Sequence, residues 1–165
     1  MKILDHKTIV QKIKRLSIEI LENNYDAAEI IIAGINNNGM IFAELLLQEL
    51  QKMDSAKLFT LSNIRLNPAN PIASEVSISL DNAYLKNKVI IIVDDVGNTG
   101  RTLFFACKPL FNVLPKKIET VVLVDRTHKS FPIKINYFGL SLSTTLKENI
   151  KVQLADNEEF AVYLV

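Results

Sequence analysis

Two adjacent carboxylates, Asp94 and Asp95, directly follow an uninterrupted apolar run and directly precede a turn that contains glycine. The run, Val89 to Val93, is β-branched throughout, as expected of a strand that is buried on both faces. Open α/β sheets bind ligands at the carboxyl ends of such strands, so both carboxylates are expected in a ligand crevice. In that position they can accept hydrogen bonds from the hydroxyl groups of a sugar.

The turn that follows has the composition of a phosphate cradle. Gly97 and Gly100 allow a close approach of the backbone to a ligand, and Thr99 and Thr102 supply hydroxyl groups. The free N–H groups that open the next helix add hydrogen-bond donors for an anion. The segment is neither a Walker A loop nor a Gly-x-Gly-x-x-Gly dinucleotide turn. The alternative is an acidic turn and a capped helix without a ligand.

This pattern resembles the phosphoribosyl pyrophosphate (PRPP) loop of type I phosphoribosyltransferases, which combines an apolar strand, two acidic residues, three variable residues, Thr-Gly and Lys/Arg-Thr. Residues 3–5, 124–129 and 151–154 extend the likeness to the branch that combines pyrimidine-operon attenuation with uracil phosphoribosyltransferase activity. The resemblance implies an α/β fold of the type I phosphoribosyltransferase kind. It has a mainly parallel five-stranded sheet flanked by helices, and a small hood from the N-terminal segment and about residues 125–165.

The resemblance also implies a reaction, in which a nucleobase replaces pyrophosphate at the anomeric carbon of PRPP. Such a reaction needs no side-chain nucleophile and depends on positioning and on stabilising separated charge. Asp94 and Asp95 would hold the ribose hydroxyls. Mg²⁺ is the implied cofactor, held mainly by the substrate because it prefers phosphate oxygens and water. The implied PRPP-binding residues are Asp94, Asp95, Val96, Gly97, Asn98, Thr99, Gly100, Arg101 and Thr102.

A second turn-rich segment, residues 34–39, stands where relatives have the pyrophosphate loop. Uracil-type relatives have Lys and Arg among its middle residues, whereas this chain has three asparagines. Because charge-assisted hydrogen bonds are about twice as strong as neutral ones, the change indicates weaker pyrophosphate binding or slow turnover. The residues assigned to this loop are Ile35, Asn36, Asn37, Asn38 and Gly39.

Arg65 is the third residue assigned to catalysis, after Asp94 and Asp95. It belongs to a long polar segment, residues 63–82, which is too long for a simple connection and is typical of an active-site lid. Closure of that lid would bring Arg65 onto pyrophosphate. The alternative is a solvated arginine on a surface loop.

Asn98 bears on the choice of base. Purine-using relatives often carry an aspartate here that handles a proton of the purine ring, and an amide cannot replace it as an acid or base. Asn98 therefore favours a pyrimidine, with uracil as the expected acceptor, although asparagine is also a common turn residue. Asp125 and Arg126, at the end of another apolar run, are assigned to the base and hood region.

The resemblance leaves a second hypothesis open, a weakly catalytic nucleotide-sensing regulator that binds the leader of a messenger RNA. Attenuator relatives use basic residues on the first helix and near the hood for this purpose. Leu146 replaces one such cation, and scattered lysines are usually a solvated surface. Transfer to another base is a third hypothesis. The candidate RNA contacts are Lys14, Arg15, His128, Lys129 and Lys147.

Alternating strands and helices must position these residues, which predicts a mainly parallel sheet. The strands are expected at 29–33, 57–62, 89–93, 118–124 and 133–138, with a short hairpin arm near 76–79 and a terminal hairpin around Asp156, Asn157 and Glu158. The helices are expected from Asp5 to Asn23 and over 40–52 and 101–113, the last distorted at Pro109.

The composition restricts the class of protein. The 165 residues carry 19 basic and 18 acidic side chains, so there is no general nucleic-acid signal. No apolar run can span a bilayer, and the N-terminus lacks a secretory pattern. The one cysteine, Cys107, is expected to be a small core residue. We expect a cytoplasmic protein with a single domain over residues 1–165 and, from the family, a homodimer or tetramer.

Overall fold

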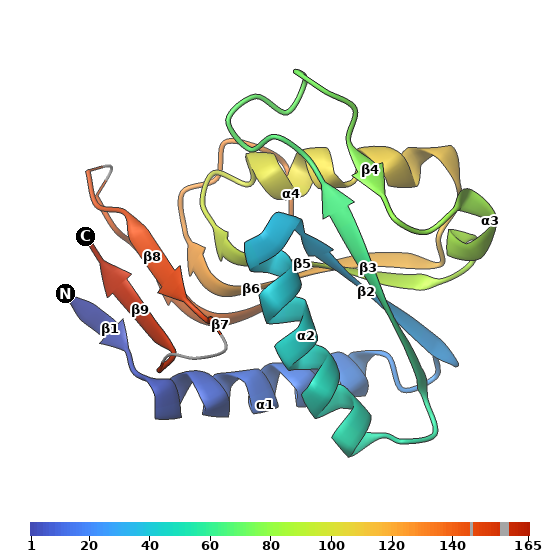
Figure 1. The fold of residues 1–165 in the computed structure, drawn as a ribbon, viewed down its shortest axis with the longest axis horizontal. Helices are drawn as coiled ribbons and strands as arrows, with labels where there is room; N and C mark the ends of the chain where they lie inside the picture. The colour runs from blue at the N-terminus through green and yellow to red at the C-terminus, as the bar shows by residue number, and fades with distance from the viewer. Residues whose placement is uncertain (146, 156–158) are drawn as a thin grey trace.

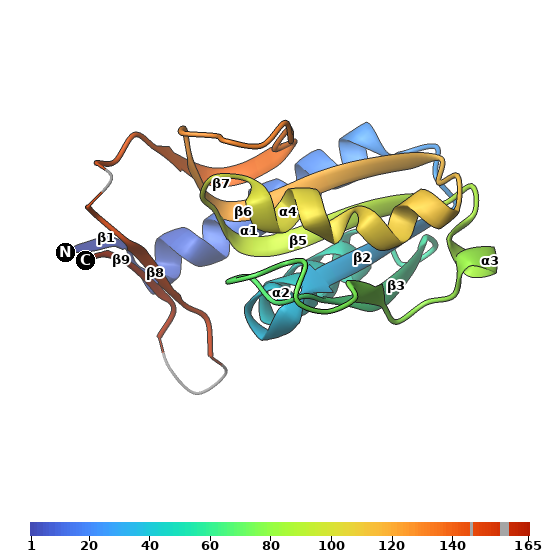
Figure 2. The same ribbon diagram turned by 90° about the horizontal axis from the view of Figure 1, so that it is seen from above.

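A six-stranded sheet crosses the molecule with helices on both faces, and a separate three-stranded sheet stands at one end (Figures 1 and 2). The structure is a computed structural model and describes residues 1–145, 147–155 and 159–165. The large sheet has the order β4-β3-β2-β5-β6-β7. Its strands are β2 (Glu29–Ile35), β3 (Leu58–Arg65), β4 (Ser77–Ile78), β5 (Val89–Gly97), β6 (Lys117–Arg126) and β7 (Tyr137–Leu142).

Five of these strands, β3, β2, β5, β6 and β7, are parallel, which confirms the predicted parallel core. The short β4 pairs antiparallel with the end of β3, so the expected hairpin arm is also present. The strand predicted at 133–138 instead begins at Tyr137. Thr120 donates through Oγ1 to the carbonyl of Lys134, and Asn136 Oδ1 accepts from the N–H of Thr120. These side-chain bonds replace the strand ladder and delay its start.

The helices lie on both faces of the sheet. α1 begins after Asp5, whose carboxylate accepts the N–H of Thr8 at 2.9 Å, an N-cap bond. α2 begins at Asn36, not near residue 40, so the predicted turn supplies the first turn of a helix. α4 stops before Pro109 and a 3₁₀ turn follows, as expected. The bounds are α1 (His6–Asn23), α2 (Asn36–Met53), α3 (Asn82–Leu85), α4 (Arg101–Ala106) and η1 (Lys108–Asn112).

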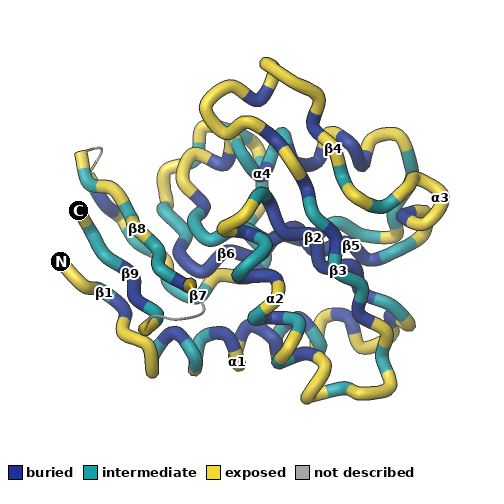
Figure 3. The backbone as a smooth tube through the Cα atoms, in the orientation of Figure 1, coloured by how far each residue is buried: buried dark blue, intermediate teal, exposed yellow. Residues whose placement is uncertain are grey.

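The central strands are buried on both faces, which explains their continuous apolar runs (Figure 3). Alternate side chains point to opposite faces, so Ile30 and Ile32 pack with α1 and α2, whereas Ile31 packs with α4 and η1. Cys107 belongs to the second of these cores, and burial raises the pKa of its thiol to about 11. This confirms that Cys107 is a core residue without an activated thiolate.

The chain termini form the small sheet, which we call the hood. It consists of β1 (Lys2–Leu4), β9 (Ala161–Leu164) and β8 (Ile150–Gln153), in that order and antiparallel. Because β7 joins the large sheet, the C-terminal part of the hood starts later than the expected residue 125. The predicted turn at Asp156, Asn157 and Glu158 lies outside the described residues. Within the described ranges, each helix is too short or too polar to cross a lipid bilayer.

The start of α2 packs directly against the end of β5. A Cβ atom at Gly39 would lie 2.5 Å from the carbonyl oxygen of Val93, so only glycine permits this approach. The contact places Asn36, Asn37 and Asn38 beside the two carboxylates that follow Val93 along the chain.

Gly39→Ala is therefore expected to lower the free energy of unfolding by about 1–3 kcal/mol, the usual effect of an overpacked contact. Urea denaturation followed by circular dichroism measures it. The control is Asn38→Ala at the neighbouring exposed helical position, where the change is expected within about 0.5 kcal/mol. Equal unfolding midpoints for the two variants would show that α2 does not depend on this contact.

Candidate functional site

A cavity of about 490 Å³ opens at the carboxyl ends of β2, β3 and β5. The chain leaves β2 toward β3 on one side and β5 toward β6 on the other, so the cavity lies at the switch point where open α/β sheets bind ligands. Its walls combine residues from all three candidate segments of the sequence. They are Ile35, Asn36, Asn37, Asn38, Arg65, Pro68, Asp94, Asp95, Val96, Asn98, Thr102 and Ile150.

The two carboxylates are held by the backbone of their own strand end. The N–H of Asp95 donates to Asp94 Oδ1, and the N–H of Val96 donates to Asp95 Oδ1, each at 2.9 Å. Burial, followed by repulsion from Asp95, raises the pKa of Asp94 well above its ordinary value. The cavity therefore favours a ligand that donates hydrogen bonds or brings a positive charge to this pair.

The glycine-containing turn forms a second, smaller recess. Residues 96–103 line a space of about 40 Å³. Gly100 has φ +85°, a left-handed conformation that glycine adopts without strain, and a Cβ atom there would lie 2.5 Å from Ile133. The exposed Asn98 and Thr99 form the outer part of the turn. The backbone is therefore shaped as expected for a loop that binds phosphate.

Lys129 supports this loop from behind. Its ammonium group lies 2.6 Å from Asp125 Oδ1 and 3.0 Å from the carbonyl oxygen of Asn98, and it also donates to the carbonyls of Gly97 and Arg126. Lys129, predicted as a possible RNA contact, and Asp125, predicted in the base and hood region, form an ion pair with each other, and both predicted roles stay predictions. In the sequence, the only indication of this ion pair is the spacing of the two opposite charges, four positions apart.

Arg126 connects the loop to the segment that leads to the hood. Its guanidinium donates to Asn98 Oδ1 at 3.4 Å and to the carbonyl of Thr145 at 2.8 Å. Its placement beside Asn98 is consistent with the predicted role in the base and hood region.

Arg65, which is predicted to contact pyrophosphate, lines the cavity from the end of β3. Its guanidinium donates to Asn37 Oδ1 at 2.9 Å, so the cation reaches the asparagine turn from the end of β3. Arg101, which is predicted to bind PRPP, donates to the carbonyl of Pro68 at 2.7 Å in the segment after β3. The two arginines thus link the long loop to both sides of the cavity.

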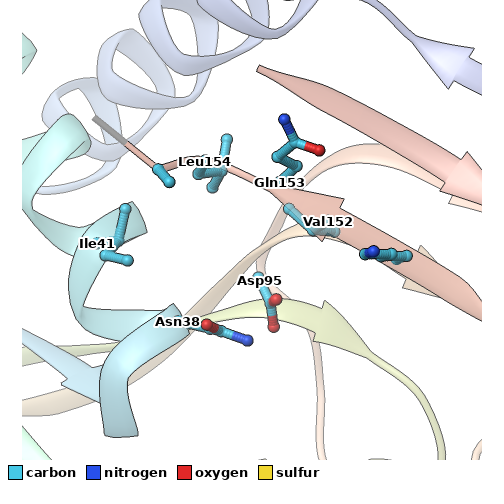
Figure 4. Close-up of a pocket in the computed structure, with 8 residues that line it drawn as sticks. Asn38, Ile41, Asp95, Val152, Gln153 and Leu154 are labelled. Atoms are coloured by element: carbon cyan, nitrogen blue, oxygen red, sulfur yellow. The ribbon is translucent and has the colours of Figure 1, made fainter. Parts of the chain in front are cut away.

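A further recess of about 270 Å³ lies between the hood and α2. Figure 4 shows Asn38 and Asp95 on one side of it, with Val152, Gln153 and Leu154 of the hood region facing them and Ile41 of α2 beside them. The sequence did not assign Ile41, Val152 or Leu154 to the site. Their apolar side chains carry no chemical signature, and only the position of the hood brings them there.

The remaining candidate RNA contacts are accessible. Lys14 and Arg15 are exposed on α1, and His128 and Lys147 are exposed in the segments after β6 and before β8. For metal binding, the described part of the chain contains no group of three or more His, Cys, Asp or Glu side chains suited to hold an ion.

Residues 1–157 match the family model described as "Phosphoribosyl transferase domain", and the chain belongs to this family. Among curated proteins it is similar to "Bifunctional protein PyrR" of Macrococcus caseolyticus, with 30% identity over 98% of this chain and 97% of that protein. The protein of the same name in Clostridium novyi is 32% identical over 93% of this chain and 90% of its own length.

Solved structures agree on the fold. A hypoxanthine-guanine phosphoribosyltransferase from Bacillus anthracis superposes with a TM-score of 0.70 at 20% identity, over 86% of this chain and 81% of that one. At this identity the likeness concerns the fold alone. The type I phosphoribosyltransferase fold and the PyrR-like family membership expected from the sequence are both confirmed.

The raised pKa of Asp94 predicts a stability effect with a definite sign. The unfolded chain releases the Asp94 proton near pH 4, but the folded chain retains it to higher pH, so stability falls as pH rises between these two pKa values. Asp94→Asn removes this loss. It is expected to raise Tm of the unliganded chain at neutral pH, whereas below about pH 4, where the carboxyl is protonated in both states, the two chains should have similar Tm values.

Differential scanning calorimetry across a pH series measures this effect. The control is Asp26→Asn, which replaces an exposed carboxylate just before β2. The difference in Tm between this variant and the unaltered chain is not expected to grow with pH. Parallel Tm curves for the unaltered chain and the Asp94 variant would contradict the prediction.

Proposed function

We propose that this chain transfers the phosphoribosyl group of PRPP to a nucleobase, with uracil as the acceptor, and releases pyrophosphate. The observation that carries the proposal is the cavity at the switch point, where the Asp94–Asp95 pair, the glycine turn, the asparagine turn and Arg65 meet. Family membership supports the same conclusion.

The geometry suggests a role for each part of the cavity. Asp94 and Asp95 accept hydrogen bonds from the ribose hydroxyls and stabilise positive charge that develops on the sugar ring. Residues 97–102 hold the 5-phosphate through backbone N–H groups and threonine hydroxyls. Arg65 and the asparagine turn face the pyrophosphate end. Catalysis then rests on positioning and charge stabilisation, and it requires no covalent intermediate.

The residues around the cavity fit a Mg²⁺ ion that the substrate brings in. Two neighbouring carboxylates repel each other, as the raised pKa of Asp94 reflects, and a cation offsets this repulsion. Mg²⁺ keeps several waters and binds substrate phosphates together with one or two carboxylates. When bound, it neutralises charge on the departing pyrophosphate.

In this proposal the nucleobase binds between the glycine-containing turn and the hood. Asn98 and Ile150 line the same cavity, and Arg126 holds the Asn98 side chain. An amide at position 98 cannot exchange a proton with a purine ring, and it can donate to or accept from a pyrimidine edge. This supports a pyrimidine acceptor.

Asp95→Asn is expected to lower turnover by at least about 100-fold, the usual loss when a preorganised group at developing charge is removed. Product formation from PRPP and Mg²⁺ is measured by chromatography with uracil, cytosine, orotate, hypoxanthine, guanine and adenine. Uridine monophosphate is the expected product, and Asp26→Asn is the control with unchanged turnover. The absence of product with every base would overturn the proposal, and product with a different base would correct the acceptor.

A second candidate function is a nucleotide-sensing regulator that binds RNA and turns over slowly. Two carboxylates line the cavity at the switch point, and Arg65 is the one cation among the described residues that line it. This charge balance favours weak pyrophosphate binding. Lys14, Arg15, His128 and Lys147 are exposed and can contact RNA phosphates.

Filter binding of a pyrimidine-operon leader RNA across a salt series tests the second function. A regulator loses affinity steeply with salt, and Lys14→Glu with Arg15→Glu lowers the slope because fewer phosphates are neutralised. Lys86→Glu, an exposed change beside α3, is the control. No association at the lowest salt would remove this function and leave the enzyme proposal intact.

We also propose that residues 1–165 act as one unit, because the hood needs β1 from the start of the chain and β8 and β9 from its end. A homodimer or tetramer remains the family-based proposal, and sedimentation equilibrium measures it directly.

A further inference from the structure

Asn36 is the first asparagine of the turn that replaces the cationic loop, and both ends of its amide bind the backbone of one residue. Its Nδ2 donates to the carbonyl of Leu66 at 2.9 Å, and its Oδ1 accepts the N–H of Leu66 at 3.1 Å. This paired bond resembles a rung of a strand ladder, made by a side chain. It fixes the orientation of the Asn36 amide independently of any ligand in the cavity.

A second amide strengthens the same junction. Asn63 Nδ2 donates to the carbonyl of Gly34 at 2.9 Å and to that of Asn36 at 3.2 Å. The parallel ladder between β2 and β3 ends at the pair Ile35 and Ile64. The asparagine bonds therefore continue the attachment of the two strands beyond the point where backbone pairing stops.

Arg65 lies between the residues that these bonds hold. Its backbone is fixed by Ile64 on one side and Leu66 on the other, and its guanidinium reaches Asn37 Oδ1. The side chain is exposed, so it would otherwise lose rotamer freedom on binding a ligand. The bond from its guanidinium to Asn37, formed on a backbone that Asn36 holds, lowers that cost because the cation is already oriented at the cavity wall.

The backbone of Asn36 explains why asparagine suits the position. Its φ is +50°, in the left-handed region that most residues avoid and asparagine tolerates. Such a conformation persists where surrounding contacts determine it. A lysine here would carry the strain and could not form the paired bond with Leu66.

We propose that Asn36 is a positioning residue that acts through Arg65, so that the end of β3 supplies the cation for the pyrophosphate group which the loop itself lacks. This inference rests on the proposed function. It reverses the expectation from the sequence, in which three asparagines only weaken the loop. The asparagine turn would instead hold a cation that comes from a neighbouring strand.

A double-mutant cycle tests the proposal. The variants are Asn36→Gly, which keeps the left-handed backbone and removes the amide, Arg65→Ala, and the two combined. Arg65→Ala is expected to raise Kd for PRPP with Mg²⁺ about tenfold or more, as for loss of a charge-assisted bond. Asn36→Gly is expected to raise Kd by a similar factor, with little further effect in the Arg65→Ala background. Titration calorimetry measures Kd.

Two further measurements separate positioning from a general loss of structure. Asn36→Gly should raise KM for PRPP and leave KM for the base unchanged, and it should speed hydrogen exchange at the Leu66 amide. Asn87→Gly is the matched control, because Asn87 also has a left-handed backbone, with φ +60°. It lies just before the amino end of β5, whereas the cavity lies at the carboxyl end. Its variant should leave Kd and both KM values unchanged.

The outcomes are distinct. Additive effects of the two substitutions on Kd, or no effect of Arg65→Ala, would overturn the role of Asn36 and leave the proposed function standing. An unaltered chain that binds neither PRPP nor a nucleoside monophosphate would overturn the proposed function and this inference together.

Discussion

The repulsion between Asp94 and Asp95 at the end of a fully buried strand is the constraint on which the rest of the site depends. Val89 to Val93 are buried on both faces, and the two carboxylates that follow them are half-buried at the wall of the cavity. Backbone N–H groups of Asp95 and Val96 compensate part of the charge, yet burial and proximity still raise the pKa of Asp94. This pair therefore favours a ligand that donates hydrogen bonds or carries positive charge, as the proposed PRPP with Mg²⁺ would.

Three of the cations near the cavity hold its walls. Lys129 neutralises Asp125 and binds carbonyls of the glycine-containing turn, Arg126 connects Asn98 to the segment before the hood, and Arg101 anchors the long loop at Pro68. These side chains, which the sequence alone would assign to ligand contacts, therefore hold the protein's own backbone and side chains in place. Rigid walls matter in a reaction that depends on positioning, because the geometry must exist before the substrate arrives.

The two sides of the cavity are joined in different ways. Beside the glycine-containing turn, β5 and β6 form a long parallel ladder that continues to Gly97 and Asp125. Beside the asparagine turn, the β2–β3 ladder ends at Ile35 and Ile64, and asparagine side chains continue the attachment. The amides of Asn36 and Asn63 thus hold the end of β3 to the start of α2 at the point where backbone pairing has stopped.

The sequence by itself determined the features that are written in neighbouring residues. Apolar runs specified the parallel strands, and the resemblance carried by Asp94, Asp95 and the glycine turn identified the family. Tertiary structure alone decided what the polar side chains bind. Asn36, Arg101 and Thr120 donate hydrogen bonds to the backbone carbonyls of Leu66, Pro68 and Lys134, respectively. The bond of Thr120 also delays the start of β7. The pattern of neighbouring residues indicates backbone conformation and burial, because side-chain burial repeats every two residues in a strand and about every 3.6 residues in a helix. A hydrogen bond between residues distant along the chain has no such period, and it exists only once packing has brought the two groups together.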